Sequence, residues 1–339
     1  MSPAADTPDA LPGEFDLIAR YFAPIARAYP GALGLTDDAA FLDLPAGHQM
    51  VATVDAMVAG VHFLADDPPD LIARKLMRVN LSDLAAKAAT PVGCLLALSL
   101  PRETTAAWIE AFARGLASDC AEFAMPLVGG DTTATDGPLT ISLTALGAIR
   151  SGRAPLRSGA KVGDRVFVSG TIGDGALGLE VAKGGLKDLA EPLREHLLRR
   201  YRLPEPKTAL APVLREFAHS AIDVSDGLLA DLGHICETSG VGAVIQAAMV
   251  PMSDGVQIAI ARDPALLARV LAGGDDYEIV FTADPAHSDR VVEAGIKVGV
   301  PITGIGFVVE RPAEGPLVKV GDLTALDMVL RASTGYRHF

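Results

Sequence analysis

Short apolar segments that end in an acidic residue recur along this chain, and they constrain its fold more than any other feature of the sequence. Six aspartates follow apolar sequence in this way: Asp37, Asp38, Asp55, Asp131, Asp223 and Asp226. A carboxylate where a buried strand meets a loop loses hydration unless a positive group compensates it, and lysine and arginine are scarce beside these positions. Magnesium takes oxygen ligands and is usually held by a few carboxylates together with substrate phosphates. The pattern therefore predicts a sheet-containing fold with a metal-phosphate site at strand ends.

A single strand-end aspartate has a simpler interpretation as a helix N-cap or an Asx turn. Asp226-Gly227 before LLADLGHI fits that interpretation well. Four separate apolar-then-acid segments are hard to explain as unrelated caps, so the repetition favours a shared site.

The alternation of strand and helix patterns predicts an α+β protein with mixed sheets covered by helices. A chain of 339 residues is longer than one hydrophobic core usually serves. Because Ser151–Asp164 is rich in glycine, serine, proline and basic residues, we place a domain boundary there, between 1–150 and 151–339. Strands are expected within 48–63 and at 126–128, 139–148, 165–170, 221–224 and 277–282. Helices are expected at about 67–89, from 104 onward, and at 176–184, 191–201, 206–218, 228–239 and 263–271.

The charge and cysteine content restrict the partners and the compartment. A formal net charge of -13, without a dense run of lysine or arginine, disfavours nucleic acids and anionic membranes as partners. Met1–Glu14 lacks the features of a signal peptide, and no apolar stretch approaches membrane-spanning length. The three cysteines, Cys94, Cys120 and Cys236, form no CxxC pair and are expected to be small buried residues. We therefore expect a cytoplasmic protein.

Asp83 is a different kind of candidate because it lies inside a predicted helix. Asn80, Asp83 and Lys87 share one helix face by their spacings of three and four. A surface pair between Asp83 and Lys87 explains this spacing as well as a functional role does. The spacing alone leaves both interpretations open.

Glycine-rich turns at 129–130, 170–175 and 273–274 would let backbone N–H groups approach phosphate oxygens. The chain has no GxxxxGK[ST] motif and no HRD and DFG pair, which excludes P-loop proteins and protein kinases. Arg157 is a candidate phosphate clamp or a solvated linker charge, and His62 orients a substrate or is simply packed. The repeated Gly-Gly-Asp at 129–131 and 273–275 reflects either a duplication or chance.

These motifs together resemble the bacterial thiamine-monophosphate kinase family, within the superfamily that includes aminoimidazole ribonucleotide synthetase and selenophosphate synthetase. The similarity runs through VDAMVAGVHF, VNLSDLAAKAATP, GGDTT, RSGAKVGD, SGTIGDGALGL, SAIDVSDGLLADLGHI, GGDDYEIVFT and GYRHF, in the family's order. It implies a homodimer in which N-terminal strands join a partner's strands in a β-barrel, and a C-terminal α/β domain that closes the active-site cleft.

The resemblance also implies roles for individual residues. Magnesium ligands are implied at Asp38, Thr53, Val54, Asp55, Asp83, Asp131 and Asp223, with Asp226 holding a further ion. ATP contacts are implied at Gly130, Asp131, Arg157 and Ser225. Positions that hold thiamine phosphate are implied at His62, Asp275 and Ser333. For Asp83, the resemblance favours the functional interpretation.

The chain departs from the family pattern at four of its positions. Thr36 replaces a glycine, Val54 a threonine and Asp275 a glutamate, while Ser333 stands where a tryptophan often contacts the substrate. The single tryptophan of the chain is Trp108. The aromatic side chain that would stack on the substrate at this position is therefore either Tyr336 or absent.

The expected reaction is magnesium-assisted, in-line transfer of the ATP γ-phosphoryl group to thiamine monophosphate, giving thiamine diphosphate and ADP. Asp55 and Asp83 are the expected central ligands. Two alternatives stay open: a related ATP-using synthetase that shares the metal-binding acids, and a non-catalytic metal- or nucleotide-binding protein.

Overall fold

The computed structural model describes residues 11–321, which form two compact units of helices packed on β-sheets. Of residues 11–321, the first unit comprises those up to Leu84 together with Pro91–Ala148, and the second comprises Ala85–Thr90 together with those from Ile149 onward. Both units combine helices with a sheet, as the α+β prediction requires. The roles expected of the two domains stay predictions.

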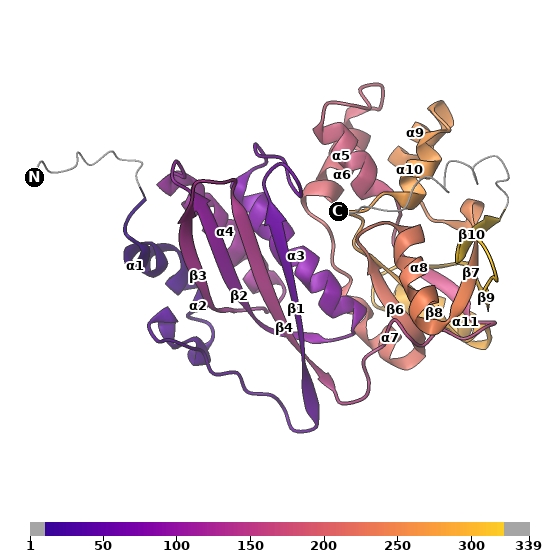
Figure 1. The fold of residues 1–339 in the computed structure, drawn as a ribbon, viewed down its shortest axis with the longest axis horizontal. Helices are drawn as coiled ribbons and strands as arrows, with labels where there is room; N and C mark the ends of the chain where they lie inside the picture. The colour runs from indigo at the N-terminus through magenta and orange to yellow at the C-terminus, as the bar shows by residue number, and fades with distance from the viewer. Residues whose placement is uncertain (1–10, 322–339) are drawn as a thin grey trace, which may run out of the picture. The chain divides into compact units, whose positions relative to one another are not determined.

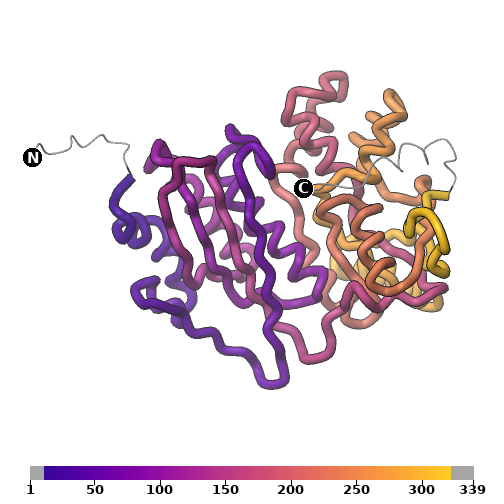
Figure 2. Tube along the Cα trace, viewed as in Figure 1, coloured from indigo at the N-terminus to yellow at the C-terminus, as the bar shows by residue number. Residues whose placement is uncertain are grey.

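A four-stranded sheet with the strand order β1-β4-β2-β3 forms the centre of the first unit, and two helices lie behind it in the view of Figure 1. The strands are β1 (His48–Val58), β2 (Thr90–Pro101), β3 (Leu127–Thr135) and β4 (Thr140–Arg150). The helices are α3 (Pro69–Ala86) and α4 (Ala106–Glu122). Their apolar faces pack on the sheet and leave Leu76, Leu84 and Phe112 fully buried. Figure 2 follows the same strands as a tube, with β2 between β4 and β3.

Strand β1 carries two chemically different sets of side chains because successive residues of a strand point to opposite faces. Its exposed positions at a spacing of two are all apolar: Met50, Ala52, Val54 and Ala56. Thr53 and Asp55, which alternate with them, are half-buried. One face of this strand is therefore apolar and exposed, and the other holds polar candidate ligands.

Short helical turns precede β1. They are α1 (Glu14–Leu17), a π-helical turn (Ile18–Phe22), α2 (Ala23–Ala26) and a 3-10 turn (Pro30–Leu35). Ala26 and Ala32 pack with Val128 of β3, which attaches this segment to the edge of the sheet.

The second unit is built on a six-stranded sheet with the order β10-β7-β9-β5-β8-β6. Its strands are β5 (Arg165–Ser169), β6 (Ala218–Val224), β7 (Val241–Gln246), β8 (Glu278–Ala283), β9 (Ile302–Glu310) and β10 (Val318–Gly321). β10 pairs with β7 in parallel, whereas β5, β6, β7, β8 and β9 pair antiparallel, so the sheet is mixed. The helices are α5 (Asp174–Ala182), α6 (Glu191–Arg202), α7 (Ala211–Phe217), α8 (Leu228–Ser239), α9 (Asp254–Arg262), α10 (Leu266–Ala272) and α11 (Ser288–Lys297).

Two strands of the first unit differ from the prediction. β2 was not predicted, because residues 94–98 are a continuous apolar run without the alternation that identifies a strand. β3 was expected to end at Val128 but continues to Thr135, through a glycine-rich and polar segment with little apolar signal. It pairs in parallel with β2 along this whole extension.

The cysteines are buried as expected, with exposed fractions of 0% for Cys94, 8% for Cys120 and 0% for Cys236. Across residues 11–321, no helix combines the length and the apolar character that a bilayer crossing requires.

Candidate active site

Three of the predicted metal ligands converge where β1 faces α3. The hydroxyl of Thr53 donates a hydrogen bond to Oδ2 of Asp83, and the backbone N–H of Asp55 donates to Oδ1 of Asn80 at 3.2 Å. Asn80 is fully buried and also donates from Nδ2 to the carbonyl of Leu76 at 2.9 Å. The amide of Asn80 thus fixes the strand against the helix, and it holds the two carboxylates on one side of the sheet.

The two carboxylates of this cluster repel each other. Burial, and then the negative charge of Asp83, raises the pKa of Asp55 to about 6. A carboxylate with such a raised pKa is one that a nearby cation stabilises strongly, because opposite charge favours the ionised form.

The donor set suits a hard divalent cation, because the side chains of Thr53, Asp55 and Asp83 offer only oxygen atoms. Val54 does not belong to this set through its side chain, which is apolar, 61% exposed and on the other face of the strand. Its main-chain carbonyl is the single oxygen that it can offer. The prediction of Val54 as a ligand therefore reduces to a backbone contact.

A cavity of about 410 Å³ in the first unit brings together another group of predicted residues. Its polar lining includes Asp37, Asp38, Gly130 and Asp131, and its apolar lining includes Phe22. The cavity lining thus combines apolar side chains with carboxylates, the composition expected of a site for a nucleotide and a metal ion.

Glycine is required at position 130 because β3 approaches β2 closely there. A Cβ atom at this position would lie 2.0 Å from the carbonyl oxygen of Leu96, its register partner on β2. The N–H of Thr132 donates to Oδ1 of Asp131 at 3.0 Å, which fixes that carboxylate at the cavity wall.

His62 and Arg157 differ in how their side chains are held. Nδ1 of His62 accepts a hydrogen bond from the backbone N–H of Val58 at 3.0 Å, so in the neutral ring the hydrogen is on Nε2. The carbonyl of His62 accepts from Nζ of Lys75 at 3.3 Å. Arg157 has an exposed side chain, and its carbonyl accepts from the hydroxyl of Ser239 at 3.0 Å. The histidine is therefore oriented by the backbone, while the arginine is placed through its main chain.

In the second unit, a carboxylate that the sequence did not single out organises the loop after β6. Oδ2 of Asp231 accepts three backbone hydrogen bonds, from Ser225 at 3.0 Å, Asp226 at 3.0 Å and Gly227 at 3.1 Å. Burial raises the pKa of Asp231 to about 7, with the charge of Asp226 adding to the shift and the three N–H donors opposing it. Asp226 was a candidate cap for α8, but the side chain that satisfies the N–H groups at this helix start is Asp231.

Replacing Asp231 with alanine is expected to lower the free energy of unfolding by about 2 kcal/mol, because three backbone donors lose their acceptor. The Asp231→Asn variant keeps one acceptor oxygen and should lose roughly half as much. Chemical denaturation of both variants measures the difference. Equal losses in the two variants would contradict the role of the shared acceptor oxygen.

The other predicted residues of the second unit lie around this loop. The carbonyl of Ser225 accepts from the N–H of Asp275 at 2.9 Å, which joins the loop after β6 to the loop before β8. Asp223 is buried near the end of β6, opposite Ile279 of β8. Ligand atoms of Asp226, Asp231 and His234 lie within 4.8 Å of one another, so Asp226 has two neighbours able to share an ion.

The glycine-rich turn at 170–175 does not offer free donors to phosphate as the sequence analysis expected. The N–H groups of Gly173 and Gly175 donate to the two carboxylate oxygens of Asp276, at 2.8 and 2.9 Å. The N–H of Gly170 donates to the carbonyl of Pro301 at 3.0 Å. The protein's own carboxylate thus occupies the position that a phosphate would take, and the expectation is wrong for this turn.

The structure therefore assembles three groups from the predicted residues. They are Thr53, Asp55 and Asp83; Asp38, Gly130 and Asp131; and Ser225, Asp226 and Asp275. Ser333 lies outside the described residues. Sequence reasoning missed Asp231 and Asp276, which hold loops in place. An acidic residue in the first turn of a predicted helix was the signal available for Asp231.

Comparison with known proteins gives a consistent result over both units. Residues 36–149 match the family model "AIR synthase related protein, N-terminal domain", and residues 161–319 match "AIR synthase related protein, C-terminal domain". Thiamine-monophosphate kinase of Caulobacter vibrioides is 47% identical over 95% of this chain and 91% of its own length.

Two solved structures extend this similarity to the fold. The crystal structure of thiamine-monophosphate kinase from Stenotrophomonas maltophilia K279a has a TM-score of 0.80 and 40% identity, covering 89% of this chain and 96% of that one. A structure of AaThiL complexed with AMPPCP and TMP has a TM-score of 0.74 and 28% identity, covering 96% of this chain and 97% of that one.

Proposed function

The chain belongs to the thiamine-monophosphate kinase family, and from this premise we propose how its acidic groups carry out the reaction. The enzyme uses ATP to phosphorylate thiamine monophosphate. The observation that carries the proposed mechanism is the convergence of Asp55 and Asp83 between β1 and α3, where burial, and then the charge of Asp83, raises the pKa of Asp55 to about 6.

Thr53, Asp55 and Asp83 are the proposed magnesium ligands at the centre of the site. Bound magnesium neutralises charge on phosphate oxygens, which lets donor and acceptor approach each other. The residues of the chain supply position: Asn80 fixes β1 against α3, and the hydroxyl of Thr53 orients the Asp83 carboxylate. Because the acceptor phosphate is already an anion, in-line transfer needs orientation and charge neutralisation more than a strong base.

The cavity beside β3 is the proposed site for ATP. Its apolar wall suits the base, and Gly130 allows a close approach of the backbone. Asp38 and Asp131, which line this cavity, are proposed to hold magnesium with the phosphates. In the second unit, Arg157 and Ser225 are proposed ATP contacts, and Asp223 and Asp226 are proposed metal ligands.

His62 and Asp275 are the proposed contacts for thiamine monophosphate. The tautomer imposed by Val58 places the hydrogen of the neutral His62 ring on Nε2, where it can be donated to an oxygen of the acceptor. Asp275 can accept hydrogen bonds from the aminopyrimidine or complement the thiazolium charge. Ser333, which lies outside the described residues, is a further proposed contact for thiamine monophosphate.

A homodimer is proposed from the exposed face of the first sheet. Val54 is 61% exposed, and Met50 and Leu95 are 37% and 38% exposed on β1 and β2. On β1, Met50 and Val54 alternate with Ala52 and Ala56 in an exposed apolar row of the kind that marks a protein interface, and β4 separates this row from Leu95 on β2. In the proposed dimer, this face meets the same face of a second copy to close a barrel.

The test is an assay of purified protein with thiamine monophosphate and ATP. We expect thiamine diphosphate and ADP to form in equal amounts with magnesium present. Removing divalent cations with EDTA should lower the rate at least about 100-fold, because the clustered carboxylates then lack their counter-charge, and excess magnesium should restore it. ADP release that depends on a different acceptor, or full activity in EDTA, would contradict the proposal.

A further inference from the structure

The loop before β8 contains two non-glycine residues in a left-handed backbone conformation. Asp275 has φ 69° and Tyr277 has φ 52°. Such conformations cost roughly 1–3 kcal/mol for residues with a side chain and persist where the surroundings determine them. The loop is therefore held in place by contacts outside it.

Backbone hydrogen bonds to the neighbouring loop supply part of this restraint. The N–H of Asp275 donates to the carbonyl of Ser225 at 2.9 Å, and the N–H of Tyr277 donates to the carbonyl of Val224 at 2.8 Å. Gly274 is needed at the crossing, since a Cβ atom there would lie 2.1 Å from the oxygen of Ser225.

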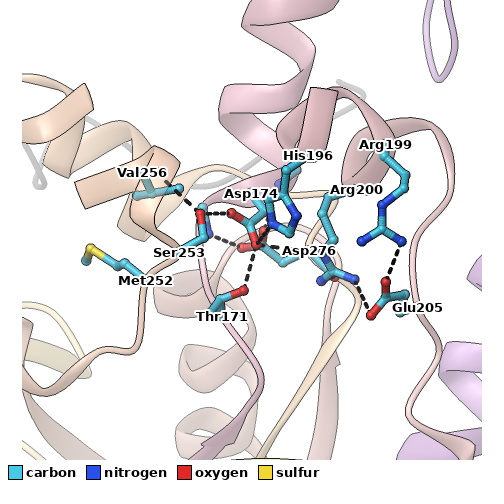
Figure 3. Close-up of polar contacts among 12 residues, drawn as sticks. Thr171, Asp174, His196, Arg199, Arg200, Glu205, Met252, Ser253, Val256 and Asp276 are labelled. Carbon is cyan, nitrogen blue, oxygen red and sulfur yellow. Dashed lines mark hydrogen bonds and ion pairs between the residues drawn. The ribbon is translucent and has the colours of Figure 1, made fainter. Parts of the chain in front are cut away.

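Asp276, between the two strained residues, anchors the loop in the interior of the second unit. Its carboxylate binds the N–H groups of Gly173 and Gly175, and its carbonyl accepts from Nη2 of Arg200 at 3.1 Å. Figure 3 shows Asp276 between Asp174 and Arg200 in this buried cluster.

Further hydrogen bonds at the start of α5 hold in place the segment that Asp276 contacts. Oδ2 of Asp174 accepts from the hydroxyl of Thr171 at 2.6 Å, and Oδ1 accepts from the hydroxyl of Ser253 at 2.5 Å. Figure 3 shows Thr171 and Ser253 directed at this carboxylate. Residues 170–175 therefore form a rigid base for the loop that carries Asp275.

One consequence of this backbone is that the side chains of Asp275 and Tyr277 meet. The Tyr277 hydroxyl donates a hydrogen bond to Oδ1 of Asp275 at 3.2 Å, and both residues are half-buried. The bond restricts rotation of the carboxylate. A carboxylate that is already oriented loses less conformational freedom when it binds a ligand.

We propose that Tyr277 is a positioning residue, whose hydroxyl orients the Asp275 carboxylate toward the organic part of thiamine monophosphate. The inference rests on the proposed role of Asp275 in substrate binding. Aspartate is one methylene shorter than the glutamate often found at this position in the family, and its Oδ1 lies within reach of the Tyr277 hydroxyl. Tyr277 affects binding through Asp275 and does not touch the reacting phosphates.

The test is a double-mutant cycle of Tyr277→Phe and Asp275→Ala. The readouts are the Kd of thiamine monophosphate, from calorimetric titration in magnesium buffer, and the KM values and kcat of the reaction. Tyr277→Phe should raise the Kd and KM for thiamine monophosphate about 5-fold to 10-fold, with kcat and the KM for ATP within about twofold. In the Asp275→Ala background, the same substitution should change the Kd less than about twofold.

Thr282→Val is the control for loss of a hydroxyl that hydrogen-bonds another side chain elsewhere in the second unit. It removes the 2.8 Å hydrogen bond between the hydroxyls of Ser220 and Thr282, away from the loop. It should lower Tm without changing the Kd of thiamine monophosphate.

An equal effect of Tyr277→Phe in both backgrounds would overturn the proposal, and so would a parallel rise in the KM for ATP. Binding and turnover of thiamine monophosphate by the unsubstituted protein test the proposed function separately from the role of Tyr277. Binding of thiamine monophosphate without turnover would refute the proposed function and leave the cycle of Kd values as the test of Tyr277. Absence of binding would refute both.

Discussion

Replacing Asp83 with asparagine is expected to lower kcat/KM for thiamine monophosphate by at least about 100-fold, with the protein still folded. Asparagine has nearly the same size and can still accept from Thr53, so the contact between β1 and α3 is kept. It lacks the negative charge that is proposed to hold magnesium. Steady-state kinetics at saturating magnesium measure the loss.

Asp55→Asn is expected to have the same effect on turnover and a different effect on stability. Burial and the charge of Asp83 raise the pKa of Asp55 to about 6, so the ionised carboxylate is unfavourable in the metal-free protein. Removing its charge should leave Tm unchanged or raise it. Asp43→Asn, at an exposed position outside the site, is the matched control and should leave the kinetics unchanged. Near-normal activity of Asp55→Asn or Asp83→Asn would refute the central role of these carboxylates.

Replacing Asp276 with alanine is expected to lower the free energy of unfolding by about 3–4 kcal/mol, because the buried N–H groups of Gly173 and Gly175 both lose their acceptor. In a unit of this size, that loss corresponds to a fall in Tm of about 10 °C. Asp276→Asn should lose less, since its single carbonyl oxygen still accepts one of the two bonds. A loss below about 1 kcal/mol in the alanine variant would contradict the anchoring role.

The pH dependence of stability gives an independent check on Asp276. Burial raises the pKa of this carboxyl from 3.8 to about 8, although the two N–H donors and Arg200 act in the opposite direction. Between about pH 4 and pH 8 the unfolded chain has therefore released a proton that the folded chain still binds, so the free energy of unfolding falls as the pH rises. Asp276→Asn lacks this contribution. The stability difference between wild type and Asp276→Asn should narrow across that range when both are denatured at several pH values.

The sequence predicted the parts of the site that depend on local pattern. Asp55 at the end of an apolar strand and Asp83 on a helix face were both candidates, and the structure brings the Asp83 carboxylate to the Thr53 hydroxyl and the backbone N–H of Asp55 to the Asn80 side chain. The α+β class followed from the alternation of strand and helix patterns, and the family followed from motifs spread over most of the chain. These features are encoded by neighbouring residues, which is why they can be recognised without a structure.

The missed features depend on contacts between distant segments. In Gly-Gly-Asp-Asp, nothing local distinguishes Asp275 from Asp276, and the left-handed backbone decides which carboxylate turns inward. The donors of the 170–175 turn were assigned to phosphate because their acceptor lies about a hundred residues later in the chain. Strand β2 was missed because its exposed positions Leu95 and Ala97 are as apolar as its buried ones, so its sequence lacks the polar alternation that a half-exposed strand usually shows.

The alternation along β1 places the proposed metal ligands and the exposed apolar surface on opposite faces of the same strand. Its odd-numbered positions include Thr53 and Asp55, and its even-numbered positions from 50 to 56 are all apolar and exposed. Because side chains repeat with a period of two, a deletion or insertion of a single residue inside this strand would exchange the two sets. The Asp55 carboxylate would then enter the apolar surface, and valine and alanine would take the places of the proposed magnesium ligands Thr53 and Asp55. We therefore expect insertions and deletions to be tolerated at the turn that contains Gly47 and not inside β1. A change of length in the turn leaves each β1 side chain on its own face of the sheet.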